Sequence, residues 1–294
     1  MAATDSRSSP GRASAPCHTR AVEELVQARP RGSAAAHVAA YSGYRSVGAA
    51  PGRHRGLPSP WLTVIVTLDE PLQVDAHPDP RQPSGSFDAL VGGLHTRPAL
   101  ISHDGRQSGV QLHLDPLAAR AVLGVPAGEL AGLDLHADDL LGARVGLLRE
   151  QLAGTDTWPA RFSVLDSTVG SWLRDVPGPP PEVRQVWHRL LAAGGAVRVE
   201  KLADEVGWSV RHLGVRFRAE TGLSPSSAAR VIRFHRARRA LQDSPQTRLG
   251  DLAADHGYYD QAHLTRDFRE LAGLPPLRWL RAEGIAFVQD LDPC

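Results

Sequence analysis

The sequence predicts a protein of the α+β class, with a β-rich N-terminal part followed by an all-α C-terminal part. Residues 37–115 hold short β-branched runs separated by Pro and Gly clusters, which is typical of strands and turns. After residue 116 the apolar residues recur at the three-to-four spacing of helices. A length of 294 residues suits roughly two domains.

The composition is that of a folded chain without a membrane segment. Apolar residues make up 42% and charged residues 22% of the sequence, which excludes wholesale disorder. The longest aliphatic run, residues 61–68, is far shorter than the ~20 residues that span a bilayer, and no apolar signal core is present at the N-terminus. We therefore expect a soluble, cytoplasmic protein with no membrane partner.

Charge and cysteine usage narrow the function classes further. The net charge is +1, but residues 182–283 hold 17 Lys and Arg against 12 Asp and Glu, a local charge of +5. A basic segment of this kind favours a polyanionic partner for that part of the chain. Cys17 and Cys294 lie near opposite ends of the sequence, so we expect neither a disulfide framework nor a thiolate zinc site.

The N-terminal elements follow in order from these patterns. Residues 1–36 are rich in Ser, Ala, Arg, Pro and Gly and are predicted to be a disordered leader, with at most one short helix near Leu25. Residues 37–175 form the predicted N-terminal domain. Its strand spacing suggests an antiparallel barrel or sandwich. The predicted strands are residues 37–44, 62–68, 71–76, 87–95, 99–102 and 109–114.

Two helices and a linker complete the first half. Apolar residues at helical spacing predict one helix across residues 140–152 and a second, antiparallel to it, across residues 162–173. Residues 176–181 lie in the run Asp-Val-Pro-Gly-Pro-Pro-Pro, which cannot continue a helix because proline lacks the amide donor. We predict a semi-rigid linker there, an all-α domain over residues 182–283 and a C-terminal tail over residues 284–294.

An internal repeat predicts that one helical unit occurs twice in the all-α domain. In each copy a short helix buries a Leu-Ala pair, a glycine supplies the positive φ of a left-handed cap, and a second helix packs Leu and Phe four residues apart. This is the pattern of a helix-turn-helix, and the second copy has one extra residue in its turn. The first copy has Leu202, Ala203, Gly207, Trp208, Leu213, Phe217, Gly222 and Pro225; the second has Leu252, Ala253, Gly257, Tyr258, Leu264, Phe268, Gly273 and Pro276.

The second helix of such a unit enters the major groove of DNA with the face opposite its core residues. On that face Arg266 has the forked donors for guanine, Gln261 could address adenine, and Val215 could meet a thymine methyl group. The second unit is therefore predicted to read bases more specifically than the first, whose helix has Gly214 at its centre. The base-edge candidates are Arg211, Val215, Gln261, Thr265 and Arg266, and the phosphate candidates are Arg218, Arg230, Arg233 and Arg269.

A long helix is predicted to join the two units. Pro225 suits its first turn, and residues 225–243 would span about 25 to 30 Å at 1.5 Å per residue. That length can hold two reading helices roughly 34 Å apart, one turn of DNA. Five arginines would give this helix a basic surface, or else a solvated face with (i, i+4) ion pairs. They are Arg230, Arg233, Arg236, Arg238 and Arg239.

Residues 182–283 resemble the DNA-binding domain of AraC/XylS-type transcription regulators. The resemblance implies two helix-turn-helix units, double-stranded DNA and RNA polymerase as partners, and activation rather than repression. It is carried by Leu202-Ala203, Ser209, Leu213, Phe217, Gly222-Leu223-Ser224-Pro225, Arg233-x3-Ala237-x2-Ala240-Leu241, and Gly257-Tyr258-x-Asp260-x4-Leu264-x3-Phe268-x4-Gly273-x2-Pro276. Tyr258 and Leu264 stand where the family favours Phe.

The upstream part resembles the N-terminal regions of one branch of these regulators. Residues 110–114, 123–130 and 148–152 carry this likeness. It implies a small barrel-like, cupin-like domain that binds a small-molecule effector, mediates homodimerisation, or both. We therefore expect residues 37–175 to be a sensing or dimerisation domain.

Rival functions find less support in the residues. A cupin-like metal-dependent enzyme fused to the DNA-binding domain would need paired histidines, and no His-x-His pair occurs among His37, His54, His77, His95, His103 and His113. No phosphate loop, nucleophile elbow or His-Glu-x-x-His helix is present either, so we predict no catalytic residue, metal or cofactor. A methyl-accepting DNA-repair regulator would need a reactive cysteine, and neither Cys17 nor Cys294 lies in a segment that resembles such a site. A protein-interaction module is the remaining alternative.

Overall fold

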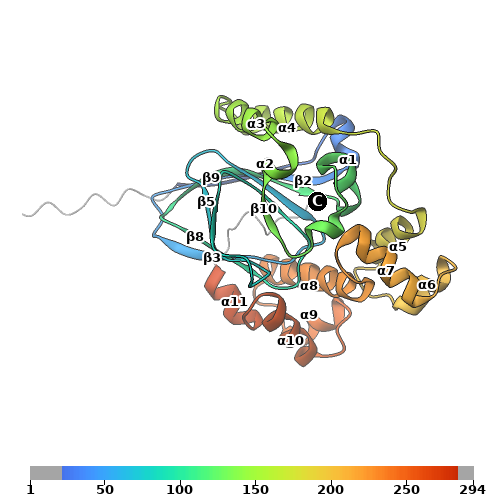
Figure 1. Cartoon of the computed structure of the whole chain (residues 1–294). Coiled ribbons are helices and arrows are strands. Elements are labelled where there is room, and N and C mark those ends of the chain that lie inside the picture. Colours follow the sequence, from blue (N-terminus) through green and yellow to red (C-terminus); the bar gives the residue numbers. More distant parts are fainter. Residues whose placement is uncertain (1–21, 284–294) are drawn as a thin grey trace, which may run out of the picture.

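The computed structural model describes residues 22–283, which form a β-rich N-terminal part and an all-α C-terminal part (Figure 1). This confirms the predicted fold class. The C-terminal tail of residues 284–294 and residues 1–21 lie outside the described part of the chain. None of the described helices is long and apolar enough to cross a membrane.

Two antiparallel sheets make up the β-rich part. The six-stranded sheet has the order β1-β2-β9-β4-β7-β10, and the four-stranded sheet has the order β3-β8-β5-β6. In the larger sheet the strands are β1 (Val22–Ala28), β2 (Val38–Val47), β9 (Arg106–Leu114), β4 (Leu62–Thr67), β7 (Ala89–Gly92) and β10 (Asp134–His136). In the smaller sheet they are β3 (Gly52–Gly56), β8 (Ala99–His103), β5 (Leu72–Ala76) and β6 (Gly85–Phe87).

Successive side chains of β4 belong to two different apolar clusters of the core. Val64 and Val66 belong to the apolar cluster shared with the helices, whereas Ile65 points into a separate cluster between the two sheets. Such alternation follows from the two-residue period of a strand. Gly43 on β2 allows the helices to come close, because any Cβ at this position would overlap the ring of Trp158.

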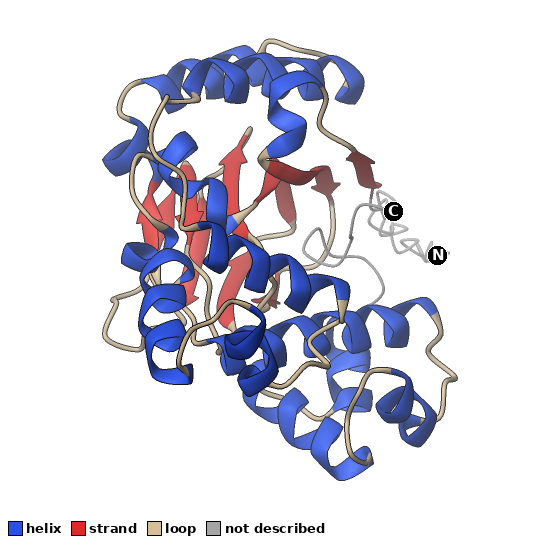
Figure 2. Cartoon of the chain, turned by 90° about the vertical axis from the view of Figure 1, so that its right-hand side faces the viewer, coloured by secondary structure: helices blue, strands red, loops and turns tan. Residues whose placement is uncertain are grey.

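Short helices surround the sheets (Figure 2). α3 and α4 lie on the face of the large sheet that carries Tyr41, where the ring of Phe162 stacks on Tyr41 at a centroid distance of 6.0 Å. The elements are η1 (Gly32–Ala36), η2 (Pro116–Ala118), α1 (Ala119–Leu123), η3 (Ala127–Leu130), α2 (Ala137–Leu141), α3 (Arg144–Ala153) and α4 (Trp158–Trp172).

Several details differ from the sequence-based expectation, among them the following. The described end of the expected disordered leader is ordered, and the segment around Leu25 is a strand and not a short helix. It is held because β1 pairs with β2 along its whole length, from Val22 with Val47 to Ala28 with Tyr41. The helix predicted over residues 140–152 is two helices, since Gly142 adopts a φ of 61° between α2 and α3. β3 lies in a Pro and Gly cluster that was expected to be a turn.

After α4 the chain runs without helix or strand through residues 173–180 and enters the all-α part at Pro181. Trp187, Phe217, Phe234 and Phe268 lie at the centre of that part, and none of them is exposed. Its helices are α5 (Pro181–Ala192), α6 (Val199–Glu205), α7 (Val210–Thr221), α8 (Pro225–Asp243), α9 (Leu249–Asp255), α10 (Gln261–Leu271) and α11 (Pro276–Glu283).

The two parts are joined by packing and by two ion pairs. Arg120 on α1 donates from Nε and Nη2 to the two carboxylate oxygens of Glu220 on α7, both at 3.1 Å. Arg55 on β3 pairs with Glu283 at the end of α11, which also accepts a hydrogen bond from the Arg55 backbone N at 3.0 Å. Each helix-turn-helix half is thus tied to the N-terminal domain at a different point.

Candidate nucleic-acid interface

The predicted repeat forms two helix-turn-helix units, α6–α7 and α9–α10. The turn glycines, Gly207 and Gly257, adopt φ values of 68° and 71°, as the left-handed cap requires. A side chain caps the N-terminus of each following helix. Ser209 accepts a hydrogen bond from the backbone N of His212 at 3.2 Å, and Asp260 accepts one from the backbone N of His263 at 2.7 Å. Both second helices therefore begin at a fixed residue.

Each second helix is held by its apolar face. Leu213 and Phe217 on α7 are fully buried, and the Phe217 ring meets Trp187 of α5 at a centroid distance of 6.0 Å. On α10, Phe268 contacts Phe234 of α8 at 5.1 Å and Trp279 of α11 at 5.8 Å. With one face fixed in the core, the opposite face of each helix is turned to solvent.

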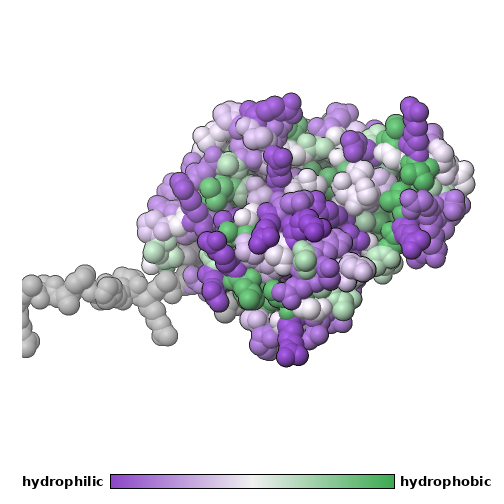
Figure 3. All heavy atoms as spheres, turned by 90° about the horizontal axis from the view of Figure 1, so that it is seen from below, coloured by the Kyte–Doolittle hydropathy of each residue, from purple (hydrophilic) through white to green (hydrophobic). Residues whose placement is uncertain are grey.

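The solvent-facing side chains include most of the predicted DNA contacts. On α7, Val215 keeps 64% of its surface exposed, and Arg211 and Arg218 are also exposed. On α10 the exposed candidates are Gln261, Arg266 and Arg269, and Thr265 is half-buried. The surface seen from the side of α9, α10 and α11 is largely hydrophilic (Figure 3).

Two predicted phosphate contacts are already engaged inside the domain. Arg230 on α8 donates from Nε to Asp267 Oδ1 at 2.7 Å and pairs through Nη2 with Glu270, so it fastens α8 to α10. Burial lowers the pKa of Arg230, but these hydrogen bonds outweigh it, and the net pKa is raised. Arg233 donates to the Gly195 carbonyl at 3.1 Å and lies over the ring of Tyr258. Both side chains thus help to hold the domain together.

Fewer arginines are exposed on α8 than the sequence predicted. Arg238 has no exposed surface and lies beside Trp279, with its guanidinium 6.0 Å from the ring centroid. The prediction was wrong for this residue because α8 is packed on several sides. Arg236 remains exposed.

Sequence reasoning missed Tyr259, which sits in the turn before α10 with 93% of its surface exposed. It is the extra residue of the second turn, since the preceding Tyr258 matches Trp208 and the following Asp260 matches the cap Ser209. An exposed aromatic ring beside the helix that is predicted to read bases is a candidate for contact with the sugar-phosphate backbone. The one-residue difference between the repeats was the available signal.

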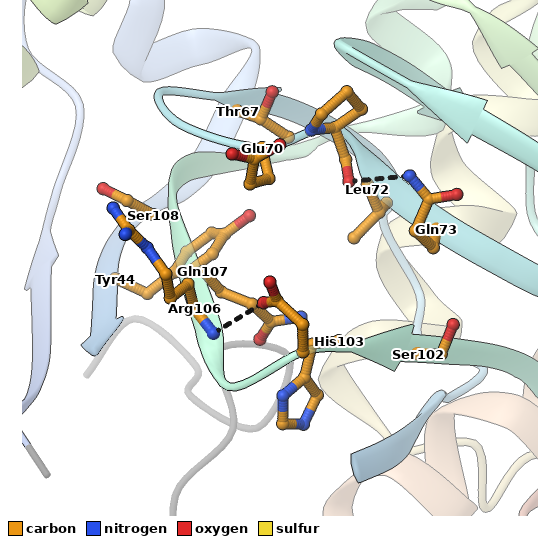
Figure 4. A pocket seen from close by; sticks show the side chains of 12 residues that line it. Tyr44, Thr67, Glu70, Leu72, Gln73, Ser102, His103, Arg106, Gln107 and Ser108 are labelled. Atoms are coloured by element: carbon orange, nitrogen blue, oxygen red, sulfur yellow. Dashed lines mark hydrogen bonds between the residues drawn. The ribbon is translucent and has the colours of Figure 1, made fainter. Parts of the chain in front are cut away.

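The N-terminal domain holds a polar hollow of about 380 Å³ where β2, the β4–β5 turn and the β8–β9 hairpin meet (Figure 4). Tyr44, Glu70, Arg106 and Gln107 are among its lining side chains. Between the sheets, His77 forms a buried pair with Asp134, Nδ1 to Oδ2, at 2.7 Å. Within residues 22–283 no three His, Cys, Asp or Glu side chains are grouped so that they could hold a metal ion.

Comparisons with known proteins bear on the C-terminal half. The family described as "Helix-turn-helix domain" matches residues 202–282. A relative from Bacillus subtilis, an uncharacterized HTH-type transcriptional regulator named YbfI, is 32% identical over 95 residues. That match covers 32% of this chain and 34% of the relative, so the chain matches only about a third of that protein.

Solved structures resemble the chain over most of its length. Apo ToxT from Vibrio cholerae, in a form with a point substitution, covers 90% of this chain and 98% of its own, with a TM-score of 0.50 and 9% identity. ToxT from Vibrio cholerae O395 also gives a TM-score of 0.50 and 9% identity, over 90% of this chain and 99% of its own. At this identity the likeness concerns the fold alone.

Proposed function

We propose that this chain, a DNA-binding regulator of the AraC/XylS type, activates transcription by reading two successive major grooves of promoter DNA. The observation that carries the proposal is the pair of capped helices, α7 and α10, which are buried on one face and present arginines on the other. α8 separates them and is about 28 Å long at 1.5 Å per residue. That length suits readers one DNA turn apart.

The N-terminal domain supplies the regulation in this proposal. Its polar hollow is a candidate site for a small effector, and its ion pairs to Glu220 and Glu283 reach both helix-turn-helix halves. A ligand or a second copy of the chain that shifts this domain would change how α7 and α10 are presented. We propose RNA polymerase as the partner in activation, the cytoplasm as the location, and no catalytic role.

Selection of bound DNA fragments followed by footprinting of the full chain tests the proposal. We expect protection on one face of the duplex across two adjacent major grooves, with centres about 34 Å apart. Protection of a single groove, or binding without sequence preference, would contradict the two-reader model. Binding to a protein in place of DNA would favour the interaction-module alternative.

Arg266 and Arg269 are exposed on the same helix and are expected to act differently. Arg266→Ala should relax preference at one base pair and cost about 1 to 3 kcal/mol of binding free energy on the best site. Arg269→Ala should weaken binding to all sequences alike and reduce the slope of log affinity against log salt by about 1. Each variant serves as control for the other, measured on a panel of single-base variants of the site. Equal effects on every site would argue against a base contact by Arg266.

Tyr259 is expected to contribute to backbone binding through its hydroxyl group. Tyr259→Phe should weaken binding several-fold on all sites, because one hydrogen bond to a phosphate is lost, a change of about 1 kcal/mol. The salt slope should stay unchanged, since no charge is removed. Tyr41→Phe in the N-terminal domain is the matched control, and equal loss from both variants would remove the assignment.

A further inference from the structure

Val215 lies at the centre of the exposed face of α7. It stands two residues from each of the buried Leu213 and Phe217, so at 3.6 residues per turn its side chain points away from the core and keeps 64% of its surface exposed. The internal repeat places Arg266 at the equivalent position of α10. An arginine offers hydrogen-bond donors to a partner, whereas a valine offers only methyl groups. The two helices therefore present different chemistry from the same place in their units.

Three arginines border this apolar centre. Arg211 and Arg218 lie on one side of Val215 and Arg216 lies on the other, as their spacing along the helix requires. All three are exposed, and none forms an ion pair with any of residues 22–283. In the major groove of DNA, base edges lie between the phosphates of two strands. An apolar centre with positive charge on both sides is complementary to that arrangement.

Gly214 is a glycine that packing does not require. Apart from the backbone of its own helix, no atom of the described residues lies within 4 Å of a Cβ built at this position. Glycine inside an exposed helix is less favourable than alanine, but it allows another molecule to approach the backbone closely. Gly214 is three residues after Arg211 and four before Arg218, so it shares their side of α7. One strand of the duplex can therefore approach that side with no side chain of residue 214 in between.

We propose that α7 selects a thymine in its groove: Val215 packs against the C5-methyl group of that base, and Gly214 lets the sugar-phosphate backbone of one strand approach the helix. Among the four standard bases, thymine is the one with an apolar group in the major groove. Because Arg266 presents donors in place of methyl groups, α10 selects a different base pair, and the two halves of the DNA site are unlike. This inference deepens the proposed function and rests on it, since α7 must lie in a groove.

Deoxyuridine tests the contact from the DNA side, because it differs from thymidine only by the missing methyl group. The full chain is titrated against its selected site with each thymine replaced in turn. We expect about fourfold weaker binding for at least one replacement, the effect of one methyl group that is no longer buried. That position should lie outside the groove in which Arg266→Ala relaxes base preference.

The outcomes separate this inference from the proposed function. If no replacement by deoxyuridine weakens binding, the thymine contact is wrong, whereas a footprint across two grooves still supports the two-reader model. A chain that selects no DNA sequence at all contradicts both.

Val215→Ala tests the same contact from the protein side. It should weaken binding to the thymine site several-fold and abolish the response to deoxyuridine, because the two methyl partners act as a pair. Val176→Ala, which shortens another exposed valine in residues 173–180, is the matched control and should keep both the affinity and the response of the parent chain. Unchanged DNA affinity of Val215→Ala would leave the exposed valine for a protein contact, and an undiminished response to deoxyuridine would place the methyl contact elsewhere. Either result overturns the inference.

Gly214→Ala tests the close approach of the DNA backbone. Gly146 in α3 likewise has no atom of the described residues, other than the backbone of its own helix, within 4 Å of an added Cβ, so Gly146→Ala is the matched control. Both variants should melt roughly 2 to 4 °C higher than the parent chain, because alanine favours the helix. Only Gly214→Ala should weaken DNA binding, and a loss of affinity in a more stable chain does not come from misfolding. Equal DNA affinity of the two variants would overturn the close approach at Gly214.

Discussion

Arg230→Ala is expected to lower the free energy of unfolding by about 3 kcal/mol, because it leaves a buried carboxylate without its partner. Asp267 exposes only 3% of its surface, and its Oδ1 accepts the Arg230 Nε hydrogen bond at 2.7 Å. The loss should fall on the α8–α10 contact and so on α10, the second of the two proposed reading helices. Chemical denaturation measures the stability, and footprinting shows whether the groove read by α10 loses protection first.

A compensating variant separates this structural role from the phosphate contact that the sequence suggested. In the double variant Arg230→Met with Asp267→Leu no buried charge is left, and stability should return to near that of the parent chain. DNA binding should return with it. If Arg230 instead contacts phosphate, the single variant will keep its stability, and the double variant will still show a salt slope reduced by about 1.

Phe268→Ala is the other substitution with a large expected effect, about 3 to 5 kcal/mol of unfolding free energy. Phe268 is fully buried where α8, α10 and α11 meet, with ring contacts to Phe234 and Trp279. Differential scanning calorimetry should record the loss as a lower melting temperature.

The repeat supplies the matched variant for this experiment. Phe217 has the same position on α7 and is equally buried, so Phe217→Ala should cost a similar free energy. The two variants should differ on DNA: Phe268→Ala loses protection in the groove read by α10, and Phe217→Ala loses it in the groove read by α7. Loss of the same groove in both variants would contradict the assignment of one groove to each helix.

The C-terminal fold was predictable because its signals are local. Leu213 and Phe217, four residues apart, mark the buried face of a helix, and Gly222 marks its end. The strands with continuous apolar runs, such as β4, were likewise evident. β1 was not, because its polar residues Glu23 and Glu24 lie on an edge strand that depends on pairing with the distant β2. Pairing of this kind has no local signature.

The candidate site likewise has a part that the sequence predicts and a part that it does not. Helical spacing placed Arg211, Arg266 and Arg269 on exposed faces. It could not show that Arg230 is held by Asp267, since the partners are 37 residues apart and meet only through the packing of α8 on α10. The cavity of about 660 Å³ that is lined by Leu117, Arg174 and Arg184 could not be predicted either, because its residues come from both parts of the chain and belong to no sequence motif.

The ordered β1 strand has a practical consequence for anyone who trims this protein before study. Removing the first 36 residues as an apparently structureless leader would strip β2 of hydrogen-bonding partners from Tyr41 to Val47. The bared edge would then be free to pair with neighbouring molecules, and loss of soluble material would follow. A start at or before residue 21 keeps that edge covered.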